Sequence, residues 1–86
     1  DARPYFEAAS YYFETGRDLK KALEWVGKAT EANPSAYWIL HLQAKIQAKL
    51  GDKTASKISA EKSMALAKAG KNEDYVTLNM KLIQSL

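Results

Sequence analysis

Apolar residues recur with the 3.6-residue period of an α-helix along the whole chain, and short breaks divide it into five segments. The first segment, residues 3 to 14, carries Tyr5, Ala8, Ala9 and Tyr12 on one helical face. Pro4 suits the first turn of that helix, and Gly16 can end it in a left-handed conformation. No stretch alternates with the period of two that β-strands show. The pattern predicts an all-α fold.

Four further helices are expected, over residues 19 to about 32, 36 to about 50, 53 to 69 and 73 to 85. Asp18, Ser35 and Asp52 can cap the N-termini of the first three of these, and either Asn72 or Asp74 starts the last. The breaks between them fall at Asn33-Pro34, Gly51 and Gly70. Because these breaks are short, consecutive helices should be antiparallel neighbours.

The second and fourth helices differ in the residues that they offer to a core. The second has Leu19, Ala22, Leu23, Val26 and Ala29 on one stripe, whereas the fourth has the smaller Ser56, Ser59, Ala60, Ser63 and Ala67. Such a small stripe allows a neighbouring helix to approach closely. Ile58 and Leu66 lie off it, and we expect them to face another part of the protein or a partner, including a second copy. Trp25 either packs at the edge of its helical pair or contacts a missing domain.

The chain also repeats itself. Gly16 and Gly51 are 35 residues apart, and the same shift aligns Tyr5, Ala9 and Tyr12 with Leu40, Ala44 and Gln47, then with Tyr75, Asn79 and Leu82. The second helices align with a shift of 34 residues, so that Ala22, Val26 and Ala29 correspond to Ser56, Ala60 and Ser63. Periods of this length are typical of helical repeat arrays.

The repeat resembles the tetratricopeptide repeat (TPR) in Tyr5, Ala8, Ala9, Tyr12, Ala22, Val26, Ala29 and Pro34. The second repeat is degenerate, with Gln43 and Gln47 at apolar positions and Ser56 and Ser63 at alanine positions. The resemblance implies two antiparallel helix-turn-helix hairpins, residues 3–33 and 35–69, in a right-handed α-solenoid fragment. The helix at 73–85 would cap its open end. All 86 residues would form one TPR-like domain.

A second resemblance rests on residues 18–25, Asn33-Pro34, residues 38–40 and residues 60–63. These segments are similar to the C-terminal, TPR-like region of a bacterial family of unknown function. Its members often carry export signals and a β-rich N-terminal domain. This resemblance implies a periplasmic or exported protein, with a cytoplasmic one as the alternative. Because the chain starts at Asp1 rather than methionine, we expect it to be a piece of a longer protein.

The TPR resemblance implies that the first helix of each pair lines a concave groove. The expected binding surface consists of Phe6, Ser10, Phe13, Trp38, His41, Lys45, Lys49, Val76, Met80 and Ile83, with Arg3, Glu14, Ala48 and Glu73 around them. Exposed aromatic residues on a small domain indicate an interaction site. His41, Lys45 and Lys49 follow one another at helical spacing and could receive a carboxylate or an acidic peptide.

Composition argues against catalysis and cofactors. The chain has no cysteine and one histidine, which excludes disulfides, thiolate metal sites and a cysteine nucleophile, and leaves His41 without a partner for metal binding. The glycines are isolated, so there is no phosphate-binding loop, and no serine has a histidine and an acid arranged as a relay. The longest stretch without charge, residues 32–44, is too short to span a membrane. We expect no enzyme activity.

Two functions remain open from the sequence. The first is a protein-interaction module that binds a protein or peptide, including its own missing N-terminal domain or a second copy. The alternative is nucleic-acid binding through Lys45, Lys49, Lys53, Lys57 and Lys62. The net charge of +3 is mild, and these lysines span the turn at Gly51-Asp52, so they need not share a face. Protein interaction is therefore favoured.

Overall fold

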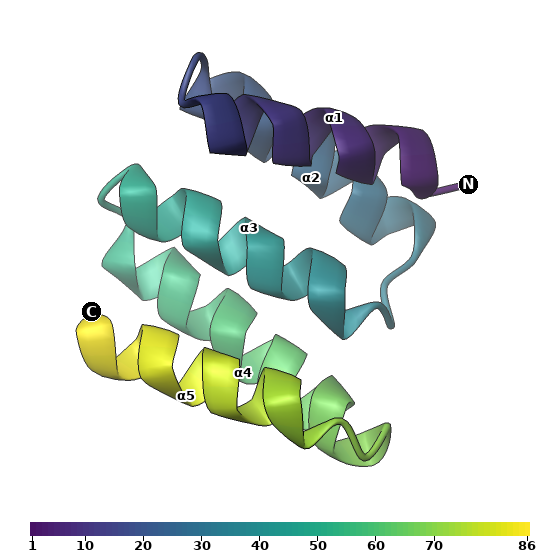
Figure 1. Cartoon of the computed structure of the whole chain (residues 1–86), viewed down its shortest axis with the longest axis vertical. Coiled ribbons are helices and arrows are strands. Elements are labelled where there is room, and N and C mark those ends of the chain that lie inside the picture. The colour runs from purple at the N-terminus through teal and green to yellow at the C-terminus, as the bar shows by residue number, and fades with distance from the viewer.

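A computed structural model describes all 86 residues. It contains five helices and no strand, which confirms the all-α prediction. The helices are α1 (Arg3–Thr15), α2 (Leu19–Ala32), α3 (Tyr37–Lys49), α4 (Lys53–Ala69) and α5 (Glu73–Ser85) (Figure 1). Each lies within a residue or two of its predicted bounds.

Side chains cap three of the helices as predicted. The carboxylate of Asp18 accepts a hydrogen bond from the Lys21 amide at 3.0 Å, and Asp52 accepts one from the Ala55 amide at 3.1 Å. Asn72, rather than Asp74, caps α5. Gly16 ends α1 with a φ of 65°, a left-handed conformation that glycine adopts without a steric penalty. The sequence signals for these helix ends were therefore sufficient.

The start of α3 differs from the prediction. Ser35 is not its N-cap; the N-cap is Ala36, and no side chain caps this helix. Ser35 instead lies in a turn after Pro34, in which the Ala36 amide donates to the Asn33 carbonyl at 3.2 Å. Ala36 is almost completely buried. Burial of the alanine therefore decides where the helix begins, ahead of the serine's capping preference.

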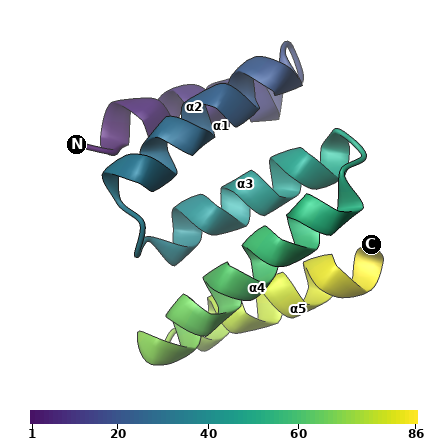
Figure 2. The same ribbon diagram turned by 180° about the vertical axis from the view of Figure 1, so that it is seen from behind.

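The helices form two layers. Figure 1 shows α1, α3 and α5 on the near face, and Figure 2 shows α2 and α4 in front when the molecule is turned around. Each helix packs on the next one along the chain. α3 also contacts α5 and touches α1 sparsely, whereas α1 and α5 do not meet. Any surface shared by α1 and α5 is therefore bridged by α3.

The N-terminal half has an apolar core of small residues with larger aliphatic ones from α3. Its fully buried members include Ala9, Ala22, Val26, Ala29 and Ile46. The rings of Tyr5, Phe6, Tyr12 and Phe13 pack around it and remain half-buried. The aromatic residues of α1 therefore close a thin core while keeping part of their surface at the exterior.

The C-terminal half has a polar core. The small stripe predicted for α4 is buried along its whole length, from Ser56 to Ala67. Its serines are held by hydrogen bonds: Ser56 donates to the Ala44 carbonyl at 2.7 Å, and Ser59 donates to Gln47 Oε1 at 2.7 Å. These hydrogen bonds therefore position α4 against α3.

Candidate binding surface on helices α1, α3 and α5

One hollow lies where the start of α1 faces the start of α3. It has a volume of about 310 Å³ and is lined by Asp1, Ala2, Arg3, Phe6, Ala32, Asn33, Trp38 and Ile39. Phe6 of α1 is half-buried, and Trp38 of α3 keeps 40% of its surface exposed. At its rim the Arg3 guanidinium forms an ion pair with the Asp1 carboxylate, which lies 2.8 Å away. We call this the aromatic hollow.

A second hollow lies toward the other end of the same layer. It has a volume of about 340 Å³ and is lined by Phe13, Lys45, Ala48, Lys49 and Leu82, from three different helices. Lys45 Nζ lies 5.2 Å from the centre of the Phe13 ring. Neither lysine forms an ion pair, and no acidic residue lines the hollow. We call this the lysine hollow.

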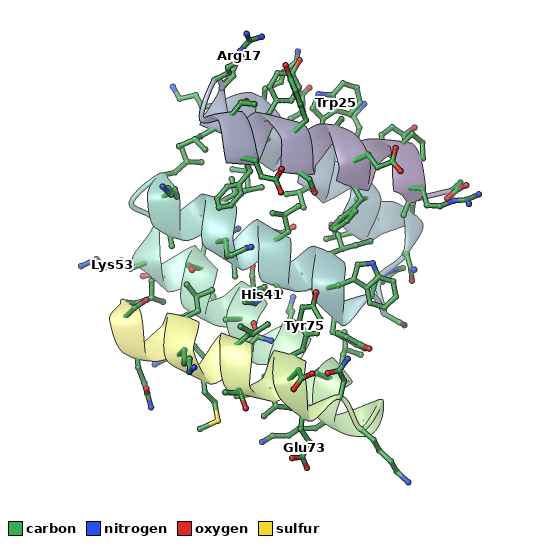
Figure 3. The ribbon with its side chains drawn as sticks, viewed as in Figure 1. Arg17, Trp25, His41, Lys53, Glu73 and Tyr75 are labelled. Carbon is green, nitrogen blue, oxygen red and sulfur yellow. The ribbon has the colours of Figure 1, made fainter.

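His41 lies elsewhere than predicted. Only 8% of its surface is exposed, because it points into the contact between α3 and α5 (Figure 3). Its ring meets the ring of Tyr75 edge to face, with centres 5.5 Å apart. Of the predicted ridge, Lys45 and Lys49 line the lysine hollow, whereas His41 lies beneath the surface.

A hydrogen-bond network holds His41 in place. Asn79 Nδ2 donates to the Ser63 hydroxyl and to the Tyr75 carbonyl, both at 2.8 Å. Since a backbone carbonyl can only accept, these contacts fix the orientation of the amide and turn Oδ1 toward His41. Ser63 in turn donates to the Tyr37 carbonyl at 2.6 Å. The network joins α3, α4 and α5 through side chains that are all buried.

The network also sets the tautomer and the pKa of His41. Asn79 Oδ1 is an acceptor, so the proton of the neutral ring sits on Nδ1 and leaves Nε2 as the basic nitrogen. Burial lowers the pKa of His41 from its ordinary value of about 6.5. The hydrogen bond to Asn79 opposes this effect, and the ammonium group of Lys45 adds to it. The structure therefore favours the neutral imidazole.

The remaining predicted surface residues do not gather at one place. Ser10 is half-buried on α1, in the sequence interval between Phe6 and Phe13. Val76 lines a separate hollow between the end of α4 and the start of α5, with Lys68, Lys71, Asn72, Glu73 and Thr77. Met80 is exposed and Ile83 half-buried, and neither lines a hollow. Sequence reasoning did not include Leu82 in the expected binding surface, because the repeat aligns it with Tyr12 on the other face of the first helix.

Trp25 packs at the edge of the α1–α2 pair, one of the two placements expected from the sequence. Its ring stacks on Tyr5, with centres 5.8 Å apart and planes inclined by 18°, and Lys28 Nζ lies 5.5 Å from its centre. The indole Nε1 is buried without a hydrogen-bond partner. Ile58 and Leu66, which were expected to face another part of the protein or a partner, lie on α4. Ile58 is half exposed and Leu66 is half-buried.

The lysines of the nucleic-acid hypothesis are divided between two helices. Lys45 and Lys49 belong to α3, whereas Lys53, Lys57 and Lys62 belong to α4 in the other layer. Lys53 projects beyond the edge of the molecule, near the α3–α4 turn (Figure 3). The two layers therefore divide these lysines, as the turn between them suggested.

The fold and the surface together define a small all-α protein with two hollows on one helical layer. None of its helices is both long and apolar enough to cross a bilayer. No three His, Cys, Asp or Glu side chains are grouped so that they could hold a metal ion. No protein-family model, no curated protein and no solved structure matches the chain.

Proposed function

We propose that the chain is a non-catalytic protein-interaction module built as a short TPR-like array. In this proposal α1–α2 and α3–α4 are successive hairpins of a right-handed solenoid, and α5 is the terminal helix. The 35-residue shift equates Ala9, Ala44 and Asn79, and all three are fully buried. The 34-residue shift does the same for Val26 and Ala60. Equal burial at equivalent positions supports a structural repeat.

The observation that carries the proposed function is the pair of hollows on the layer of α1, α3 and α5. Phe6, Trp38 and Phe13 present aromatic surface there that the rest of the chain leaves partly uncovered. Aromatic residues are enriched in protein interfaces, where their area is buried at a small cost in side-chain entropy. Lysines without partners beside them add a preference for acidic ligands.

A displayed peptide library tests the proposed function without a known partner. We expect peptides selected on the chain to shift the backbone amide signals of Phe6, Phe13 and Trp38. Binding should weaken at least about tenfold, the equivalent of about 1.4 kcal/mol, in Trp38→Ala or Phe13→Ala.

Ile58→Ala serves as the matched control, because Ile58 is also an exposed apolar residue but lies on α4. It should leave the affinity of the selected peptides unchanged. Selected peptides that shift only signals of α2 or α4, or that bind all three variants equally, would contradict the proposed function.

A further inference from the structure

The two hollows are in register along α1 and α3. Phe6 and Phe13 are seven residues apart on α1, and Trp38 and Lys45 are seven apart on α3. Seven residues are two helical turns, a rise of about 10.5 Å. Both helices run in the same direction in Figure 1. The aromatic hollow and the lysine hollow are therefore two helical turns apart along the shared direction of α1 and α3.

The two hollows differ in chemistry. The aromatic hollow offers Phe6, Trp38 and Ile39, and its one arginine is already neutralised by Asp1. The lysine hollow offers two ammonium groups without carboxylate partners above an apolar base of Phe13, Ala48 and Leu82. A complementary ligand carries a large apolar group and, about 10 Å away, a negatively charged one.

The two hollows lie along one groove between α1 and α3. The backbone of the helices that line this groove favours a helical ligand over an extended one. The walls are helices, whose amide and carbonyl groups are used within α1 and α3. An extended peptide that moved from water into this groove would have backbone N–H and C=O groups without hydrogen-bond partners, which is unfavourable. A helix pairs its backbone internally and presents side chains alone, as in the known helix-in-groove mode of recognition.

We propose that this groove binds one amphipathic, acidic helix of a partner protein. The helix places a large apolar residue in the aromatic hollow and an Asp or Glu, seven positions away on the same face, in the lysine hollow. This inference rests on the proposed function, and it specifies the ligand by conformation, charge and spacing.

A designed peptide tests the spacing directly. The probe is a helical peptide with a central Trp and a Glu seven residues before and after it, so that either orientation satisfies the groove. The control peptide has the same composition, with both Glu residues moved to the opposite face. In fluorescence titrations the probe should bind at least about tenfold more tightly than the control peptide.

Protein variants locate the contacts of that probe. The double variant Lys45→Gln, Lys49→Gln should weaken the probe at least about fivefold and leave the control peptide unaffected. The matched control is Lys57→Gln, Lys62→Gln, which removes two exposed lysines of α4 and should change neither affinity. Trp38→Ala should weaken both peptides, because both carry the central Trp.

Three results would overturn the inference. They are equal binding of probe and control peptide, equally tight binding of a version of the probe in which proline substitutions prevent helix formation, and displacement of the probe by a single-stranded oligonucleotide at lower concentration. If library peptides still map to Phe6, Phe13 and Trp38 but lack the seven-residue spacing, the proposed function stands and this inference alone fails.

Discussion

His41 Nδ1 lies 2.7 Å from Asn79 Oδ1, and this hydrogen bond joins α3 to α5 inside the protein. Asn79 is the one residue of α5 that is buried. The amide satisfies the imidazole, the Ser63 hydroxyl and a carbonyl of its own helix at once. The position of α5 therefore depends on a polar residue as well as on its half-buried apolar face.

Asn79→Ala should destabilise the protein by about 2–3 kcal/mol, because it leaves the buried His41 N–H without an acceptor and opens a small cavity. Urea unfolding followed by circular dichroism measures the change. Ser10→Ala is the control, since Ser10 is half-buried and makes no side-chain hydrogen bond, and it should change stability by less than about 0.5 kcal/mol. Equal effects of the two variants would show that the network does not stabilise α5.

Acid should weaken the fold through His41. Its pKa is lowered in the folded state, chiefly by burial, so the unfolded chain binds more protons below about pH 6.5. The contribution of the neutral ring is complete above that pH and is lost as the pH falls toward the folded-state pKa. The free energy of unfolding should therefore decrease between pH 7 and pH 5.

Two measurements show whether His41 causes this pH dependence of the free energy of unfolding. Because His41 is the sole histidine, its ring proton signals report its pKa directly in an NMR titration. In His41→Gln the free energy of unfolding should be nearly constant over the same range. A His41 titration midpoint at or above about 6.5 would contradict the role assigned to burial.

Trp25→Phe should cost less stability than Trp25→Ala by at least about 1 kcal/mol. Phenylalanine keeps a ring on Tyr5 and removes the indole N–H, which is buried without a partner. Alanine loses the stacking and the buried area together. Thermal or urea unfolding of both variants gives the comparison. If Trp25→Phe were as damaging as Trp25→Ala, the indole nitrogen would have a partner that this arrangement does not contain.

Two glycines should respond in opposite directions to alanine. Gly27 lies within α2 with open space around the position of a Cβ, so Gly27→Ala should stabilise the protein by about 0.5–1 kcal/mol. Gly16 has a φ of 65°, where any side chain is strained, so Gly16→Ala should destabilise it by about 1 kcal/mol. Thermal unfolding of the two variants measures both signs. A destabilising Gly27→Ala would indicate a neighbour packed on this face of α2.

The sequence predicted the helices because their ends are governed by local chemistry. Asp18, Asp52, Asn72 and Gly16 act within three residues of themselves, and all four behave as their residue types suggest. Ser35 failed because a tertiary effect, the burial of Ala36, outweighed a local preference. Local signals are thus reliable until they compete with packing.

The candidate site was harder to predict because a helical face does not specify which side chains a second helix will cover. Periodicity placed His41 with Lys45 and Lys49, but it could not show that α5 lies over the histidine. One signal was present: the repeat aligns Asn79 with Ala9 and Ala44, so an asparagine occupies a position of small buried residues. A buried amide requires partners, and a nearby histidine is a suitable one.

Because α1 and α5 are not packed against each other, α5 can unfold locally while α1 and α2 stay folded. α5 packs on α3 and α4, and its backbone does not approach that of α1 or α2, so its detachment leaves the α1–α2 pair in place. Such fraying leaves the aromatic hollow intact and removes Leu82 from the wall of the lysine hollow. A ligand that filled the lysine hollow would therefore hold α5 in place, and its binding would be thermodynamically linked to the folding of this edge.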